Sequence, residues 1–555
     1  MAAAWKSRGT RVRHLGRTGR ATTVLLAAGI GMLSPGAGVL PAWAQPTTVA
    51  PDDGGYYATA PPLDGFPVPA DSGKPDETYE MSKGCVSSGL GEHIDIKSRP
   101  WGQEYLQIDK LQEIVRAATG SAGKGIKVAV IDTGVRQHPY FQDRVESGGD
   151  YVATPSKLPP GLEDCDGHGT EVAGIIAANP DKDKGIGFKG VAPDATILSI
   201  RQSSQNYSKK DQTSTPAASS SNVPTSTGES QKPTSGSEIP PTQKSTGSGS
   251  GQSDLGGTQP GQTNGGRQQS QPGTAGSLNT LSQAVVRAAN AGASVINMSV
   301  DSCRLADGKI SDPERALQAA MHYAVEVKNV VVVAAAGNIT DTCKQNDQLN
   351  PQQPKTIVTP PWFSDDVLSV GAIDTSGGVA SFSVNGPWVS VAAPGTEITS
   401  LDPAPNSTGL ANLTIEGGNQ PGQIQGTSFA APYVAGVAAL VRAKYPALNA
   451  RDVMQRIKST AQHPAAPGGR DNFVGYGVID PMAALTSNVS NDAMPSIKPV
   501  QSIADLPPAD GRDWTPIVVA LAGAGGGLVA LLITVFVMHT ARRKQSTPKP
   551  PSARV

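Results

Sequence analysis

The segment Val128-Ala129-Val130-Ile131-Asp132-Thr133-Gly134-Val135 decides the fold. It begins with a continuous apolar run, which is typical of a strand buried on both faces of a parallel sheet. The run ends in a carboxylate followed by a tight turn, and functional groups in parallel sheets collect at the carboxyl ends of strands. Asp132 is therefore a candidate functional residue, although such a position can also serve a metal, a ribose or the structure alone.

Similar runs recur along the chain and alternate with helical patterns. Strands are predicted at 126–131, 196–200, 295–296 and 330–333, and helices at 104–118, 170–178, 280–291 and 313–327. This alternation predicts an α/β fold with a mainly parallel central sheet flanked by helices.

Two further segments place reactive side chains at the start of helices. In Asp166-Gly167-His168-Gly169-Thr170, the glycines let the backbone pass close to the imidazole. In Gly426-Thr427-Ser428-Phe429-Ala430-Ala431-Pro432, the serine opens an apolar helix. The free N–H groups and partial positive charge there suit a nucleophile whose acyl intermediate becomes negative. Taken singly, the histidine could be structural and the serine an ordinary helix cap.

Together the three segments resemble the subtilase family of serine proteases, in residue order and in local sequence, over about residues 102–485. The resemblance implies a subtilisin-like fold and a catalytic triad. Ser428 would attack a peptide carbonyl, His168 would move the proton, and Asp132 would hold the imidazole. No metal and no cofactor are expected, because the chain has no zinc-spaced Cys/His cluster and no phosphate-binding glycine loop.

The resemblance extends to the substrate-binding residues. The segment Val333-Ala334-Ala335-Ala336-Gly337-Asn338 resembles the oxyanion-hole segment, which implies that the Asn338 amide and the Ser428 N–H are the donors. The segment Asn297-Met298-Ser299-Val300 resembles the strand that lines the specificity pocket, so Ser299, Val300 and Gly337 are expected to contact substrate. Where the family usually has glycine, this chain has Asp301, which could favour a basic substrate side chain or face solvent.

The two ends of the chain predict its topology. Residues 1–44 read as a secretory signal peptide, with an uncleaved anchor as the alternative. Residues 517–538 carry no charge and are followed by Arg542, Arg543 and Lys544, which predicts a single transmembrane helix with a cytoplasmic tail, rather than a buried core helix. The region between them is expected to be extracytoplasmic at the cell membrane. Its four cysteines, Cys85, Cys165, Cys303 and Cys343, are then expected to form two disulfides, in any of three pairings.

The remaining segments complete the predicted domain organisation. Residues 45–101 are an irregular extension, 102–487 the peptidase domain, 488–516 a linker and 539–555 the tail. Residues 202–277 are nearly all Ser, Thr, Gly, Gln, Pro and Lys, which predicts a disordered insert. It is either an inert spacer or a segment with a regulatory or substrate-like role. The net charge of −1 provides no field that would attract nucleic acid.

This architecture resembles the mycosins, the membrane-anchored subtilases of mycobacterial type VII secretion systems. The resemblance implies that the extension wraps the catalytic domain, and that Cys85 pairs with Cys165 and Cys303 with Cys343. It also implies two roles: a processing endopeptidase that acts on secreted proteins or peptides, and a scaffold or cap of the secretion membrane complex. A degradative surface protease is a third possibility.

Overall fold

The computed structural model describes residues 56–153, 158–181, 184–210, 273–346, 352–415, 420–489 and 527–540. The predicted signal peptide 1–44, the interior of the predicted insert, and nearly all of the predicted linker 488–516 and tail 539–555 lie outside these residues.

The core is a seven-stranded sheet in which every neighbouring pair is parallel, with the order β13-β12-β10-β8-β3-β5-β4. Its strands are β3 (Lys127–Asp132), β4 (Val145–Asp150), β5 (Thr196–Arg201), β8 (Val295–Met298), β10 (Val331–Ala335), β12 (Leu368–Ile373) and β13 (Val391–Pro394). The predicted parallel α/β fold is confirmed, and the four predicted strands correspond to β3, β5, β8 and β10.

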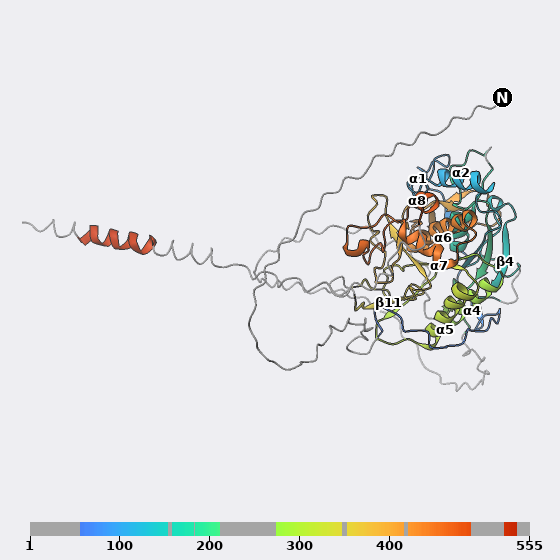
Figure 1. Ribbon diagram of the computed structural model, residues 1–555, viewed down its shortest axis with the longest axis horizontal. Coiled ribbons are helices and arrows are strands. Elements are labelled where there is room, and N and C mark those ends of the chain that lie inside the picture. Colours follow the sequence, from blue (N-terminus) through green and yellow to red (C-terminus); the bar gives the residue numbers. More distant parts are fainter. Residues whose placement is uncertain are drawn as a thin grey trace, which may run out of the picture. The chain divides into compact units, whose positions relative to one another are not determined.

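Helices cover the sheet in two groups (Figure 1). The first group packs around the long, buried helix α6 (Thr427–Lys444) and contains α2 (Ile108–Thr119), α3 (His168–Ala177), α7 (Ala450–Ser459) and α8 (Pro481–Thr486). The second group contains α4 (Leu278–Asn290) and α5 (Asp312–His322), which pack against each other. A π-helical turn, η3 (Tyr323–Val327), follows α5, so the helix predicted at 313–327 changes its hydrogen-bond pattern at its end. The described residues also include the 3₁₀ turns η1 (Pro139–Phe141), which buries Tyr140 and Phe141 in the core, and η4 (Pro467–Gly469).

The prediction of a single helix at 104–118 is wrong in one respect, because the structure has two helices there. Helix α1 (Trp101–Tyr105) ends before Gln107, whose φ of 54° lies in the left-handed region, and α2 begins at Ile108. A left-handed residue cannot continue a right-handed helix, so the chain changes direction at this point.

Four small antiparallel sheets surround the core. They pair β1 (Tyr79–Met81) with β6 (Ser204–Lys209) and β7 (Thr274–Ala275), β2 (Ser87–Gly89) with β16 (Leu413–Ile415) and β17 (Gly422–Gln423), β9 (Ser302–Leu305) with β11 (Thr356–Thr359), and β14 (Ser400–Leu401) with β15 (Leu410–Ala411). Strands β1 and β2 belong to the N-terminal extension, which therefore adds edge strands to two separate parts of the catalytic domain.

The ends of the predicted disordered insert 202–277 are ordered, which corrects its boundaries. Residues 204–209 and 274–275 form β6 and β7, and β6 pairs with β1 of the extension. The stabilising partner comes from a distant part of the chain, so the polar local composition does not reveal these strands.

Residues 527–540 form a helix, which overlaps the later part of the predicted span 517–538. The earlier part of that span lies outside the described residues. Within the described ranges, no helix is both long enough and apolar enough to cross a membrane.

Candidate active site

The structure brings Asp132, His168 and Ser428 together at the carboxyl end of β3, a strand inside the central sheet. Asp132 ends β3, His168 begins α3, and Ser428 is the second residue of α6. His168 Nδ1 lies 2.8 Å from Asp132 Oδ1, and His168 Nε2 lies 3.0 Å from Ser428 Oγ. The three residues are only 0%, 4% and 2% exposed, in that order. This continuous path allows the imidazole to accept the serine proton while the carboxylate stabilises the imidazolium.

Thr133 fixes the position of the Asp132 carboxylate relative to the histidine. Its backbone N–H donates to Asp132 Oδ1 at 2.7 Å. Its hydroxyl donates to Asp164 Oδ1 at 2.9 Å and accepts from the backbone N–H of Gly169 at 2.9 Å. One threonine therefore connects the end of β3 with the first turn of α3.

Asp164 holds the turn that presents His168. It accepts hydrogen bonds from the backbone N–H groups of Gly167 and Thr170 and from the Thr170 hydroxyl, at 2.7, 2.9 and 2.6 Å. These bonds satisfy donors at the start of α3 that have no partner within the helix. Burial raises the pKa of this carboxyl. Sequence reasoning missed Asp164, although an acidic residue just before a helix is a recognisable signal.

Asp166 ties the same turn to β6. Its two oxygens accept from the Ser204 hydroxyl at 2.6 Å and from the Gln205 backbone N–H at 2.7 Å. Burial raises the pKa of Asp166 to about 6. Asp166, two residues before His168, is thus hydrogen-bonded to β6, at the start of the predicted insert. The sequence around Asp166 does not indicate this contact.

At Gly134 and Gly169 another part of the backbone lies so close that there is no room for a side chain. A Cβ on Gly169 would lie 2.0 Å from the carbonyl oxygen of Gly134, and a Cβ on Gly134 would lie 2.0 Å from the carbonyl oxygen of Glu163. Neither backbone can accept a side chain without moving, so the glycines beside Asp132 and His168 serve the packing of the turn.

Asn338 lies beside Ser428, because its side chain bonds to the residue that precedes the serine. Its side-chain oxygen accepts from the Thr427 backbone N–H at 2.9 Å and from the Thr427 hydroxyl at 3.1 Å. The Gly337 N–H donates to that same hydroxyl at 3.2 Å. Because Thr427 precedes Ser428, these bonds fix the orientation of the Asn338 amide relative to the nucleophile.

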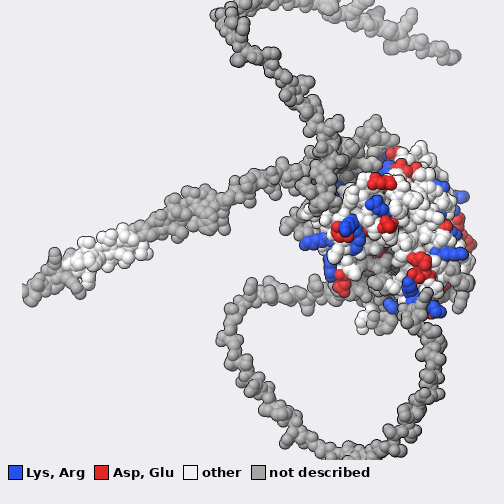
Figure 2. Space-filling model, turned by 90° about the horizontal axis from the view of Figure 1, so that it is seen from below, with Lys and Arg blue, Asp and Glu red and all other residues white. Residues whose placement is uncertain are grey.

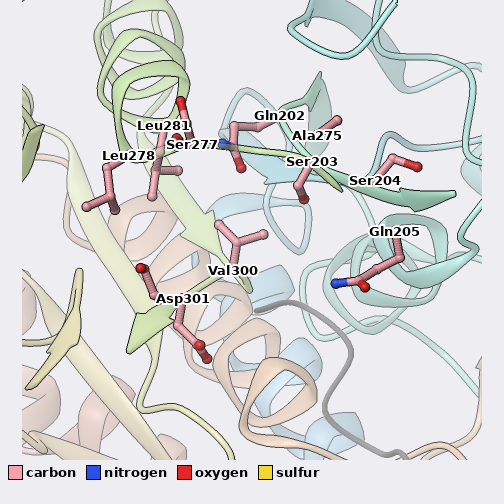
Figure 3. A pocket seen from close by; sticks show the side chains of 11 residues that line it. Gln202, Ser203, Ser204, Gln205, Ala275, Ser277, Leu278, Leu281, Val300 and Asp301 are labelled. Carbon is pink, nitrogen blue, oxygen red and sulfur yellow. Dashed lines mark hydrogen bonds between the residues drawn. The ribbon is translucent and has the colours of Figure 1, made fainter. Parts of the chain in front are cut away.

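The predicted pocket residues have different surroundings. The Ser299 hydroxyl donates to the Ser428 carbonyl at 2.7 Å and accepts from Asn297 Nδ2 at 2.9 Å, so it faces the backbone of the nucleophile. Val300 and Asp301 line a shallow hollow together with Leu278 and Leu281 of α4 (Figure 3).

The cysteines are joined as Cys85–Cys165 and Cys303–Cys343, the pairing implied by the resemblance. The first disulfide connects the extension to the loop that leads into His168. The second connects β9, which follows the pocket segment, to the loop after Asn338. Both therefore brace segments that lead to the site.

Among the described residues, no three His, Cys, Asp or Glu side chains are placed to hold a metal ion. Acidic and basic residues are interspersed on the face of the domain shown in Figure 2.

Comparison with known proteins agrees with this geometry. The subtilase (peptidase S8) family model matches residues 123–477. Mycosin-1 of Mycolicibacterium smegmatis is 36% identical over 502 residues, covering 88% of this chain and 95% of that protein. The crystal structure of MycP1 from Mycobacterium smegmatis has a TM-score of 0.61 at 36% identity, covering 78% of this chain and 95% of that one. A chain in an intact ESX-5 inner membrane complex has a TM-score of 0.59 at 36% identity, covering 86% and 97%. The predicted family is confirmed: the chain belongs to the subtilase family of serine proteases, and within it to the mycosins.

Proposed function

We propose that this protease is a membrane-anchored endopeptidase of the extracytoplasmic side that processes secreted substrates of a type VII secretion system and associates with its membrane complex. Asp132, His168 and Ser428 form its catalytic triad. The observation that carries the catalytic part is the unbroken path of two hydrogen bonds, 2.8 and 3.0 Å, that joins these side chains.

The reaction follows from this path. Ser428 Oγ attacks the scissile carbonyl while His168 Nε2 takes its proton, and the carbonyl oxygen becomes negative. His168 then gives the proton to the departing amine, leaving an acyl group on Ser428. Water, deprotonated by the same nitrogen, releases the acyl group and restores the serine.

The negative oxygen needs donors that are fixed in advance. The Asn338 side chain and the Ser428 backbone N–H supply them. The bonds from Thr427 to Asn338 Oδ1 support this role, because they direct the amide oxygen toward Thr427 and so orient the amide nitrogen away from it.

Location and partners rest on the ends of the chain and on the relatives. Residues 1–44 form the signal peptide, 517–538 the anchor and 539–555 the cytoplasmic tail, with 488–516 as the linker to the peptidase domain 102–487. The two disulfides are suited to an oxidising compartment. A similar chain is part of an intact ESX-5 inner membrane complex, which supports association with such a complex.

A scaffold role is the second candidate function. The similar chain in an intact ESX-5 inner membrane complex supports it, and in the described part of the extension β1 and β2 pair with strands of the catalytic domain. A mainly structural protein would keep the complex assembled whether or not it cuts.

Substitution of the nucleophile separates these functions. A fluorophosphonate probe should label the wild-type chain and the matched Ser376→Ala variant, whose serine lies in an exposed turn, but not Ser428→Ala. In cells, Ser428→Ala should stop processing of secreted substrates, and deletion of the whole chain should also destabilise the complex. Absence of labelling of the wild type would refute the proposed chemistry. Broad peptide cleavage without any secretion defect on deletion would instead identify a degradative protease.

A further inference from the structure

The side chain of Phe429 lies against the imidazole of His168. Their ring centroids are 4.8 Å apart and their planes are inclined by 53°. This separation is within the range in which aromatic rings attract each other. Both imidazole nitrogens already have hydrogen-bond partners, Asp132 Oδ1 and Ser428 Oγ. The phenyl ring therefore adds a third contact that does not compete for either nitrogen.

Phe429 is itself held in place by the fold. It follows Ser428 in the first turn of α6, where its backbone N–H donates to the Gly426 carbonyl at 3.1 Å. Its side chain is only 4% exposed and belongs to the main apolar core. Helix α6 packs against α3, which begins at His168. Two consecutive residues of α6 thus contact the same imidazole, Ser428 through its hydroxyl and Phe429 through its ring.

This third contact matters most once the serine hydroxyl has reacted. In the proposed reaction, Ser428 Oγ becomes bonded to the attacked carbon, and His168 carries the proton on Nε2. The hydrogen bond that the hydroxyl donates to Nε2 is lost at that stage. Asp132 still holds the Nδ1 side of the imidazolium, whereas Nε2 must keep its N–H directed at the departing amine. A ring packed against the imidazolium limits how far it can turn away.

The phenyl ring also suits the charge that appears on His168. A cation near the face of a phenyl ring, within about 6 Å of its centroid, is attracted by the ring. Two rings with centroids 4.8 Å apart cannot meet edge to edge, so a ring face takes part in this contact. The imidazolium forms only when the serine attacks, so the attraction stabilises the transition state more than the bound substrate.

We propose that Phe429 is a positioning residue for the proton transfer, whose aromatic ring holds the imidazole of His168 and stabilises its protonated form. This role rests on the proposed protease function of Ser428.

Substitutions of Phe429 in the full-length chain test this role. Active enzyme would be counted by fluorophosphonate labelling, and a fluorogenic peptide would give kcat and KM. Phe429→Leu keeps an apolar side chain without a ring, so kcat should fall roughly 3- to 10-fold, the effect of one aromatic pair, while KM stays within about twofold. Phe429→Tyr keeps the ring and should restore kcat to within about twofold of the wild type.

A fluorinated analogue tests the ring's charge distribution with little change in its shape. Trifluorophenylalanine, incorporated at position 429 by codon suppression, has less electron density on the ring face. The kcat should then fall roughly 2- to 5-fold, with thermal unfolding as in the wild type. The matched control carries the same analogue at Phe188, a fully buried core residue in the loop after α3, and should keep the wild-type kcat.

Two results would overturn this role while leaving the proposed protease function intact. One is a folded Phe429→Leu variant with the kcat of the wild type, because any apolar side chain would then suffice. The other is an equal kcat for phenylalanine and trifluorophenylalanine at position 429, and this comparison decides alone if Phe429→Leu does not fold. A wild-type chain that neither labels nor cleaves the peptide would instead refute the protease function itself.

Discussion

The hydroxyl of Ser299 donates a 2.7 Å hydrogen bond to the backbone carbonyl of Ser428. This bond connects the segment just after β8 to the first turn of α6, and the donor itself accepts a hydrogen bond from the side chain of Asn297 in β8. The residue that follows β8 thus holds the backbone of Ser428, separately from the contact between the Ser428 hydroxyl and His168.

Replacing Ser299 by alanine removes this connection. It leaves a buried carbonyl and the Asn297 amide each without one partner, so the free energy of unfolding should fall by about 1–3 kcal/mol. The kcat should fall roughly 10-fold, the effect of about 1.4 kcal/mol on the barrier, as the nucleophile loses its alignment. Denaturant unfolding and peptide kinetics measure both effects, with Ser376→Ala as the control. A fully active Ser299→Ala would show that His168 alone aligns the nucleophile.

Two substitutions of Asn338 distinguish its donor role from its structural role. Asn338→Ala and Asn338→Asp both remove the amide N–H, so kcat should fall roughly 10²- to 10³-fold or more in each. Asn338→Asp keeps an oxygen that accepts from Thr427, whereas Asn338→Ala does not. Thermal unfolding should therefore show the greater loss of stability in Asn338→Ala. An Asn338→Ala variant with nearly normal kcat would exclude Asn338 from the oxyanion hole.

The two disulfides should contribute similarly to stability but differently to activity. They join residues 80 and 40 positions apart, and doubling a closed loop adds only about 0.6 kcal/mol. Removing either pair by serine substitution should lower the free energy of unfolding by about 2–4 kcal/mol.

Loss of Cys85–Cys165 should also lower kcat, because it frees the loop that leads into His168. Peptide kinetics on both double variants at a temperature where each is folded would measure this difference. Equal kcat values would show that Asp164 and Asp166 hold the loop without help.

The Asp166 carboxyl should make stability depend on pH. Its pKa is raised from 3.8 to about 6 in the folded chain, so the folded state binds the proton more tightly than the unfolded state. The stability this provides is fully present below pH 4 and is lost as the pH rises through 6. At pH 7 the ionised group costs about 3 kcal/mol relative to low pH.

An Asp166→Asn variant should lack this dependence. The amide can accept from Gln205 and donate to the Ser204 hydroxyl, which keeps both contacts. The difference in unfolding free energy between variant and wild type should therefore grow from pH 4 to pH 7. Asp312→Asn provides the exposed comparison. Parallel pH profiles of Asp166→Asn and the wild type would refute this linkage.

The sequence indicated the residues whose surroundings are local. Asp132, His168 and Ser428 each lie in a short segment whose glycines and apolar neighbours carry the signal, and strands β3 and β10 are long apolar runs. Strands β4, β12 and β13 were missed. Strand β4, for example, reads Val-Glu-Ser-Gly-Gly-Asp and has no apolar run.

Contacts between distant segments left little trace in the sequence. Asp166 is hydrogen-bonded to β6, and β6 pairs with β1, which lies more than a hundred residues away along the chain. The composition of a segment indicates its own conformational preference. An edge strand is stabilised by the strand that it pairs with, and that partner becomes known only from the fold.

The position of the insert has a consequence for the integrity of the molecule. Cys85 and Cys165 both precede it, and Cys303 and Cys343 both follow it, so no covalent crosslink spans residues 211–272. A single cut there would give two polypeptides that separate in denaturant even without a reductant. In native buffer they would stay together through the pairing of β3 with β8 and of β6 with β7. The enzyme would then be a heterodimer, with Asp132 and His168 on one subunit and Ser428 on the other.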